Sequence, residues 1–207
     1  MKKILINLLF ESPKESGIYR TFYYLLKYLT KIKQEELVFY LAISREGYWD
    51  LERVYFVKKE VNKKMENLKS IQIQFLLYDL LKEIKPDLIL NPYHIGYLFH
   101  SKIPQISFLH DIILLTTFKR NIFLYYYQSI IFKRLVNNSQ IIITPSRFSK
   151  NEIINFFNIP ENKVKVVYWG IDLSTFYPLN LPKENFYLIV NATFPYKNVD
   201  YVIKLWK

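Results

Sequence analysis

The stretch Pro104-Gln-Ile-Ser-Phe-Leu-His-Asp111 decides how this chain is expected to fold. Apolar residues run through it and stop abruptly at His110 and Asp111. Such a run, ending in two titratable residues, predicts a buried parallel strand whose carboxyl end opens into a crevice. In open α/β sheets, ligands bind at such strand ends. An isolated His-Asp pair is also common as a loop cap, so the rest of the chain has to decide between a reactive site and a cap.

Strands and helices are expected to alternate on both sides of this stretch. Short apolar runs predict strands at 4–10, 37–43, 54–57, 88–90, 105–109, 141–144 and 164–168. Apolar residues at helical spacing predict helices at 18–32, 73–84 and 120–137 and one that begins near Ser146, with Ser149 and Glu152 as its capping box. The alternation predicts an α/β fold with a doubly wound, mostly parallel, Rossmann-like sheet. Charges around 54–57 place that strand nearer an edge.

Two predicted loops at the carboxyl edge of the sheet contain glycine. Gly17 precedes the first predicted helix, where unpaired N–H groups and the positive end of the helix dipole favour an anion by about 0.3–1 kcal/mol. The alternative is that Gly17 only permits a tight turn. His94 and Gly96 follow the strand at 88–90, and they either line the crevice or are ordinary loop residues.

The composition is that of a folded domain without cysteine chemistry. Of the 207 residues, 51% are hydrophobic and 23% are charged, so a packed core is expected and extensive disorder is not. The absence of cysteine excludes disulfides, thiolate nucleophiles and zinc sites built from cysteine. The three histidines, His94, His100 and His110, stand at no metal-ligand spacing, and we therefore predict no structural metal.

The formal charge of +11 favours anionic partners, whether phosphorylated small molecules, anionic bilayers or nucleic acid. No apolar run reaches the roughly 18 residues of a membrane span, and 1–7 does not resemble a signal peptide. We expect a cytoplasmic protein, with a peripheral position at the inner face of the cell membrane as a further expectation.

The predicted helix at 120–137 is apolar almost all round, so it must be buried or bound to something. Lys119, Arg120, Lys133 and Arg134 flank its aromatic residues. One interpretation is burial against the sheet with a solvated basic rim. The other is contact with an anionic membrane interface.

The chain is expected to contain one complete domain and the beginning of another. Residues 1–178 form the first domain, 179–185 are a polar linker, and 186–207 hold a strand at 186–190, a turn and a helix. A single strand and one amphipathic helix cannot bury their own apolar faces. We therefore expect 186–207 to be the start of a second domain whose remainder is missing.

The order of several short motifs resembles that of a known enzyme family. They are Gly17-Ile-Tyr-Arg20, Pro104 through Asp111, Ile143-Thr-Pro-Ser-Arg-Phe-Ser-Lys150, Lys163 through Asp172 with Phe176-Tyr-Pro178, and Pro195-Tyr-Lys-Asn198. None is specific alone, but their order over about 180 residues resembles the N-terminal half of a family 4 glycosyltransferase. That family consists of retaining sugar transferases with two Rossmann-like domains in the GT-B arrangement.

The resemblance implies a division of labour between two domains. The first mainly binds the acceptor, a glycan or a lipid-linked sugar, and the second binds the nucleotide-sugar donor, which is a substrate rather than a cofactor. Gly17 would approach the donor diphosphate, and His110 would face the transferred sugar as the catalytic residue. Asp111 would orient the loop, and Lys197 would neutralise the leaving diphosphate.

Three departures from the family pattern limit these expectations. The first loop keeps only Gly17 where members often have several glycines, and Ala192 stands where many have an arginine. The acidic pair and nucleotide pocket of the second domain are also missing. We therefore expect a glycosyltransferase-like (hexosyltransferase) acceptor domain for cell-surface polysaccharide or glycolipid synthesis. It is expected to be inactive alone, and to be either truncated or completed by a separate donor-domain chain. The alternative is a non-catalytic module that binds a membrane surface or a partner; no nucleic-acid partner is expected, since the basic residues are dispersed.

Overall fold

The computed structural model describes residues 1–9, 17–32, 36–44, 54–60, 69–116, 122–174, 176–179, 182, 185–186, 188–189 and 197–206. These residues group into two units, Met1–Trp169 and Gly170–Lys207. The first contains β1 (Lys2–Leu8), α1 (Gly17–Ile32), β2 (Leu37–Ile43), β3 (Val54–Lys58), α2 (Lys69–Ile84), β4 (Leu88–Asn91), β5 (Gln105–Phe108), α3 (Ile113–Thr116), α4 (Ile122–Asn138), β6 (Ile141–Thr144), α5 (Arg147–Phe157), the 3-10 turn η2 (Glu161–Lys163) and β7 (Val164–Val166). The second contains α6 (Val199–Trp206).

The described strands form one seven-stranded sheet in the order β3-β2-β1-β4-β5-β6-β7, in which every pair is parallel. This confirms the predicted doubly wound, Rossmann-like α/β fold, and it confirms that β3 lies at an edge. The chain adds strands outward from β1 to β3 and then returns to place β4 on the other side of β1. The order therefore reverses between β1 and β4, which is the switch point at which open α/β sheets bind ligands.

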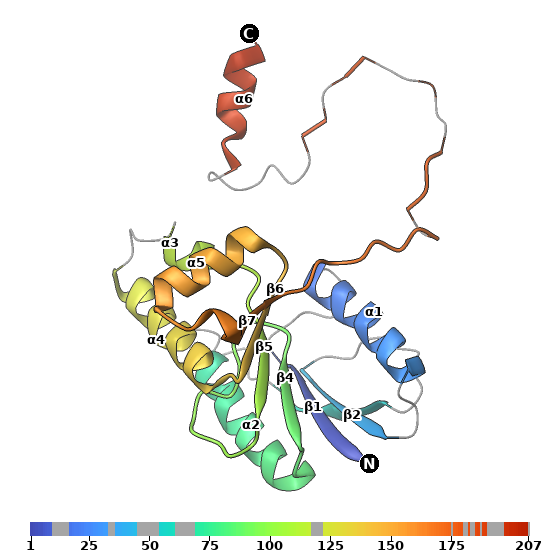
Figure 1. The fold of residues 1–207 in the computed structure, drawn as a ribbon, viewed down its shortest axis with the longest axis vertical. Helices are drawn as coiled ribbons and strands as arrows, with labels where there is room; N and C mark the ends of the chain where they lie inside the picture. Colours follow the sequence, from blue (N-terminus) through green and yellow to red (C-terminus); the bar gives the residue numbers. More distant parts are fainter. Residues whose placement is uncertain are drawn as a thin grey trace. The chain divides into compact units, whose positions relative to one another are not determined.

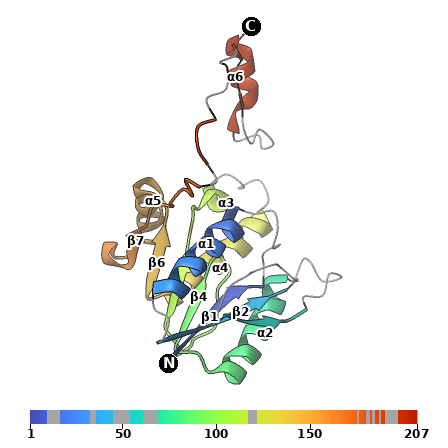
Figure 2. The same ribbon diagram turned by 90° about the vertical axis from the view of Figure 1, so that its right-hand side faces the viewer.

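Each face of the sheet is covered by different helices. Phe22 and Leu26 of α1 pack on one face, against residues such as Ile6 and Leu41. On the opposite face, α2 contributes Ile73 and Leu77 to a second cluster, and α4, α3 and α5 build a third with β6 and β7. Figure 1 shows α1 on the opposite side of the sheet from α2 and α4, and Figure 2 shows α1 crossing in front of the strands.

Helix α4 is neither fully buried nor fully exposed. Its second half is buried through Ile131, Phe132, Leu135 and Val136. The apolar side chains of its first half, Ile122 to Tyr126, are largely exposed, and Phe123 is 88% exposed. Burial against the sheet therefore accounts for only one end of the helix, while Lys119 and Arg120 lie outside the described residues.

Two local predictions differ from the structure. The N-cap of α5 is Ser146, whose Oγ accepts the N–H of Ser149 at 3.0 Å, so the capping box predicted at Ser149 and Glu152 was wrong. Ser149 lies inside the first turn because the helix begins at Arg147, directly after its N-cap Ser146 and soon after β6 ends at Thr144. In the stretch predicted as a strand at 186–190, the described residues Phe186, Leu188 and Ile189 are not in a strand, because an isolated strand leaves its N–H and C=O groups unpaired.

The second unit contains the predicted helix. Asn198 has a positive φ of 52°, and its carbonyl accepts the N–H groups of Tyr201 and Val202, so α6 begins directly after it. The predicted boundaries at 178 and 186 stay predictions.

None of the described helices is both long and apolar enough to cross a bilayer.

Candidate functional site

The candidate site lies where β1, β4, β5 and β6 end. All four strands are parallel, so their carboxyl ends meet at one edge of the sheet, beside the switch point between β1 and β4. The helix that follows β1 starts at this same edge, because α1 has to return along the sheet to reach β2. The loops after β4 and β5 therefore lie on the edge from which α1 starts.

A buried polar cluster supports the loop after β4. Asn91 is fully buried, and its Nδ2 donates to Gln105 Oε1 at 3.1 Å and to Ser107 Oγ at 3.0 Å. The Ser107 hydroxyl is in turn hydrogen-bonded to Ser139 Oγ at 2.7 Å, and Ser139 Oγ donates to Leu135 O at 2.6 Å. Hydrogen bonds between buried polar side chains fix the relative positions of the elements that carry them. The cluster thus joins β4, β5 and the end of α4.

The same loop is held by hydrogen bonds from side chains to its backbone. Asn7 of β1 donates to Ile95 O at 2.9 Å, and Gln105 donates to Tyr97 O at 3.1 Å. Gln74 of α2 donates to Gly96 O at 2.9 Å and accepts the N–H of Leu98 at 2.7 Å. These bonds satisfy backbone groups that would otherwise be buried without partners. The loop is therefore fixed by three different elements of the sheet and its helix layer.

Gly96 has a steric role in this loop. A Cβ atom placed on it would lie 2.5 Å from Leu135 Cδ1 and 2.6 Å from Asn91 Nδ2. Only a glycine fits between α4 and the buried amide without displacing one of them. The structure thus supports the interpretation of Gly96 as a residue that packs the loop rather than one that lines a crevice.

His110 stands at the end of β5, against the loop after β4. Its Nε2 lies 3.2 Å from Pro92 O, and since a carbonyl can only accept, Nε2 carries the hydrogen. The ring centroid of Trp169 lies 5.6 Å from that of His110 and 5.7 Å from that of Phe108. Phe108 also meets Phe22 of α1 edge to face at 4.7 Å. Aromatic contacts therefore connect α1, β5 and His110.

His94 lies deeper than His110 and stacks on Phe132 of α4, with ring centroids 5.0 Å apart. It is 8% exposed. Burial, and secondarily the electrostatic interaction with His110, lower the pKa of His94 to about 3. His94 is therefore a neutral structural residue at physiological pH, in line with the interpretation of it as an ordinary loop residue.

Asp111 caps the turn that follows His110. Its Oδ1 accepts the N–H of Ile113 at 3.0 Å, at the start of α3. This contact is of the loop-capping kind. A role in orienting the His110 loop for substrate remains a prediction.

Gly17 is the first residue of α1 and is exposed. Its φ is not positive, and a Cβ placed on it meets no atom within 4 Å. Neither the backbone nor packing within the described residues requires glycine here, in contrast to Gly96. Lys197 lies in the second unit, just before α6. The predicted roles of Gly17 and Lys197 toward a diphosphate stay predictions.

The metal prediction also stays a prediction. Across the described ranges, no group of three or more histidine, aspartate and glutamate side chains is placed to hold an ion.

Sequence reasoning missed Trp169 and the Asn91 cluster as parts of this site. The signal for the cluster was available, because Asn91, Gln105 and Ser107 interrupt otherwise apolar strands. A polar residue on a strand buried on both faces needs a partner on a neighbouring strand. Trp169 gave no such signal, since only the fold brings it to Phe108 and His110.

The chain matches a known protein family. A family model described as "Glycosyltransferase Family 4" matches residues 16–175. The O-antigen chain mannosyltransferase RfbU of Salmonella typhimurium is 31% identical over 78 residues, which are 38% of this chain and 22% of that protein.

Solved structures share the fold at low sequence identity. Sucrose-phosphate synthase from Thermosynechococcus elongatus matches with a TM-score of 0.63 and 12% identity, over 88% of this chain and 53% of that one. HepE from Anabaena, solved with UDP and glucose, matches with a TM-score of 0.55 and 16% identity, over 84% of this chain and 46% of that one. UDP-GlcNAc 2-epimerase from Neisseria meningitidis, solved with UDP-GlcNAc, matches with a TM-score of 0.55 and 18% identity, over 80% of this chain and 45% of that one. The chain spans about half the length of these solved structures.

Proposed function

This chain belongs to Glycosyltransferase Family 4, and from that membership we propose that it is the acceptor-side half of a retaining hexosyltransferase that uses a nucleotide sugar. Its fold matches one half of a GT-B glycosyltransferase. The proposed product is a cell-surface polysaccharide or glycolipid, and the support for it is the partial similarity to an O-antigen mannosyltransferase. The proposed acceptor is accordingly a glycan or a lipid-linked sugar.

The observation that carries this proposal is the position of His110 at the switch-point edge of the sheet. The hydrogen bond to Pro92 O and the contact with Trp169 orient its ring. In the proposed mechanism, the ring hydrogen-bonds a hydroxyl of the transferred sugar or stabilises positive charge in an oxocarbenium-like transition state. Fixed groups of this kind accelerate reactions because they need no reorganisation when charge develops.

The other proposed site residues act on the donor and on the loop. Gly17, at the positive end of the α1 dipole, would admit the donor diphosphate close to the backbone. Lys197 would neutralise the leaving diphosphate. Asp111 would hold the turn that carries His110. The donor itself would be bound by a second half, either in the same protein or in a separate chain.

The experiment is to measure sugar transfer by this chain joined to its donor-binding half, with a panel of nucleotide sugars and a lipid-linked acceptor. His110→Ala should lower kcat by at least about tenfold, because the ring would contact the transferred sugar in the transition state. His100→Ala is the matched control, since His100 is exposed and lies in the same stretch of chain. It should leave kcat unchanged.

Two outcomes would contradict the proposal. Failure of the completed protein to transfer any sugar would remove the transferase function. Unchanged turnover in His110→Ala would leave His110 with only a structural role in its loop.

A second candidate function is a non-catalytic module that binds a membrane surface or a partner. The observation that favours it is the exposed apolar first half of α4. The two candidates share a proposed location, in the cytoplasm and peripheral to the inner face of the cell membrane. They differ in whether sugar transfer requires His110.

A further inference from the structure

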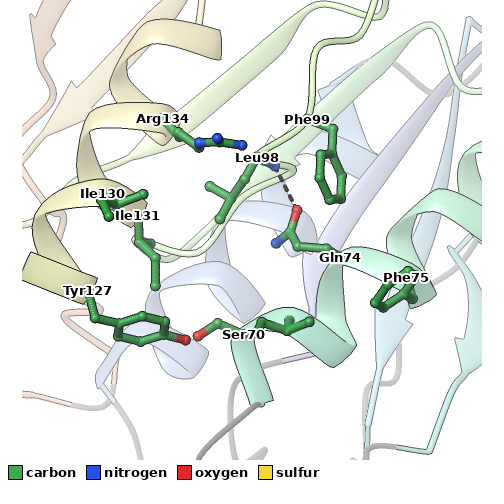
Figure 3. Close-up of a pocket in the computed structure, with 10 residues that line it drawn as sticks. Ser70, Gln74, Phe75, Leu98, Phe99, Tyr127, Ile130, Ile131 and Arg134 are labelled. Atoms are coloured by element: carbon green, nitrogen blue, oxygen red, sulfur yellow. Dashed lines mark hydrogen bonds between the residues drawn. The ribbon is translucent and has the colours of Figure 1, made fainter. Parts of the chain in front are cut away.

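The helix layer formed by α2 and α4 contains a pocket of about 210 Å³. Each of the two helices forms one wall with residues at helical spacing, and the loop after β4 completes the lining. The lining residues are Ser70, Ile71, Gln74 and Phe75 of α2, Tyr127, Ile130, Ile131 and Arg134 of α4, and Leu98 and Phe99 of the loop (Figure 3). The pocket lies on the opposite side of the sheet from α1 (Figure 1).

The pocket has a buried floor and an exposed rim. Ser70, Gln74 and Ile131 are at most 8% exposed, whereas Phe75 and Phe99 are 61% and 45% exposed. A hollow with this profile encloses part of a small molecule instead of only covering it on one side. A cavity of about 150 Å³ with apolar walls can hold benzene, so a volume of about 210 Å³ has room for a body of one or two rings.

Aromatic rings enter the pocket from all three elements that line it. Phe75 comes from α2, Phe99 from the loop after β4, and Tyr127 from α4. The Gln74 amide in the floor is already engaged, since it donates to Gly96 O at 2.9 Å and accepts the N–H of Leu98 at 2.7 Å. Rings gain from contact with other rings beyond the burial of their area, so this lining favours a flat aromatic body.

Arg134 places a positive charge at one end of the pocket, and Tyr127 stands at the other end (Figure 3). Lys133 is its exposed neighbour on α4, a helix that contains no acidic residue. Among the residues that the structure describes, neither cation forms an ion pair with a carboxylate. A guanidinium binds a carboxylate through two parallel hydrogen bonds, and it binds a phenyl or alkyl group much less specifically. The charge of the pocket therefore favours a ligand with an anionic group.

We propose that this pocket binds a small aromatic carboxylate, with its ring among the three aromatic side chains and its carboxylate at Arg134. A neutral molecule of the same shape would leave the guanidinium without a counter-charge. A saturated molecule of the same volume would lose the contacts between rings. The site is separate from the edge of the sheet that carries His110, and the inference goes beyond sugar transfer.

The pocket shares its floor with the loop after β4. Gln74 holds the backbone of this loop, and Leu98 and Phe99 belong to both the loop and the pocket lining. A ligand that binds only when these residues are in place stabilises them by mass action. Pro92 O of the same loop accepts the hydrogen bond of His110. An occupied pocket should therefore reduce local opening of the loop on which His110 rests.

The first test is calorimetric titration of the chain with naphthoate, with naphthylmethanol as its neutral analogue and decalin carboxylate as its saturated one. Naphthoate should bind about tenfold more tightly than the alcohol, because only the carboxylate forms charge-assisted hydrogen bonds with Arg134. It should bind about fivefold more tightly than the saturated acid, which lacks a π-system. Absence of naphthoate binding would overturn the proposal. Equal affinity for either analogue would overturn the assigned role of the cation or of the rings.

Two variants locate the binding in the pocket. Arg134→Gln should weaken naphthoate binding about tenfold and leave the affinity for naphthylmethanol unchanged, since only the carboxylate uses the guanidinium. Phe75→Ser should weaken the binding of both ligands about fivefold, because both contact the ring. Phe75 and Arg134 are exposed, so neither substitution disturbs the core.

The matched controls lie on α1, across the sheet. Lys31→Gln removes an exposed cation, and Tyr28→Ser removes an aromatic ring that is 56% exposed. Both variants should bind naphthoate as the parent does. Equal losses in Lys31→Gln and Arg134→Gln would overturn the proposal, since the binding would then reflect only the net charge of +11.

The second test is hydrogen exchange measured by mass spectrometry, with and without saturating naphthoate. Amide exchange should slow in residues 93–99 and stay unchanged in α1, and Arg134→Gln should remove the slowing at the same naphthoate concentration. Equal slowing in α1, or heat of binding without slowing in residues 93–99, would overturn the assignment of the ligand to this pocket. Neither experiment uses a sugar, so its outcome is independent of the transfer proposal.

Discussion

Two loops leave the same edge of the sheet and are stabilised in different ways. The loop after β4 is held by side chains from other elements, among them Asn7, Gln74 and Gln105. The turn after β5 is held mainly by hydrogen bonds of its own side chains. His110 Nε2 donates to Pro92 O, and Asp111 Oδ1 accepts the N–H of Ile113. The first loop is therefore the platform, and the turn that carries His110 rests on it. Changes in the platform should cost stability, whereas changes in the turn should cost function.

The largest effect is expected from Asn91→Leu. The substitution removes the buried amide that donates hydrogen bonds to Gln105 Oε1 and Ser107 Oγ. We expect it to lower the free energy of unfolding by about 3 kcal/mol. Urea denaturation measures this. Asn155→Leu, on the exposed side of α5, should change stability by no more than about 0.5 kcal/mol. Similar losses in both variants would show that the loss does not come from the buried hydrogen bonds of the platform.

Next in size is Gly96→Ala. The new methyl group would meet Leu135 and Asn91 at less than van der Waals distance, so we expect a loss of about 2 kcal/mol in the free energy of unfolding. Gly17→Ala is the matched comparison, because its methyl group meets no atom within 4 Å. It should leave stability unchanged or raise it by about 0.5 kcal/mol. If Gly17→Ala also lowers transfer activity in the completed enzyme, Gly17 is needed for ligand binding rather than for folding.

His94 should make the platform sensitive to pH. The folded-state pKa is about 3 and the unfolded value is about 6.5, so below pH 6.5 the unfolded chain binds a proton that the folded ring does not. The free energy of unfolding should therefore fall as the pH falls from 6.5 toward 3, by at most about 1.4 kcal/mol per pH unit. Denaturation series at pH 7, 6 and 5 test this. His94→Gln should show a shallower slope, and an identical slope would assign the acid sensitivity to other groups.

The smallest effect is expected at a third loop on this edge, after β6. Ser146→Ala removes the N-cap of α5 and should cost about 1 kcal/mol. Ser149→Ala keeps that cap and should cost less. A larger loss from Ser149→Ala than from Ser146→Ala would restore the capping box at Ser149 and Glu152.

The order of strands and helices could be predicted because each depends on local periodicity. Apolar runs such as 37–43 and 141–144 coincide with β2 and β6, since a strand buried on both faces has to be apolar throughout. His110 and Asp111 were found for the same reason, as the first polar residues after β5. The cap at Ser146 was misplaced because two serines at i and i+3 offer the same local chemistry, and only the end of β6 decides between them.

The sequence by itself thus determined the fold class, the family and the edge of the sheet that carries His110, because all three follow from short-range patterns. Only the tertiary structure decided which residues support that edge. Asn91, Gln105 and Ser139 meet from separate strands and a helix end, and Trp169 reaches His110 from beyond β7. Tertiary structure also divided α4 into a buried half and an exposed half, because the helix extends past the surface on which it packs. Contacts of this kind depend on where elements lie in space, which residue spacing along the chain does not encode.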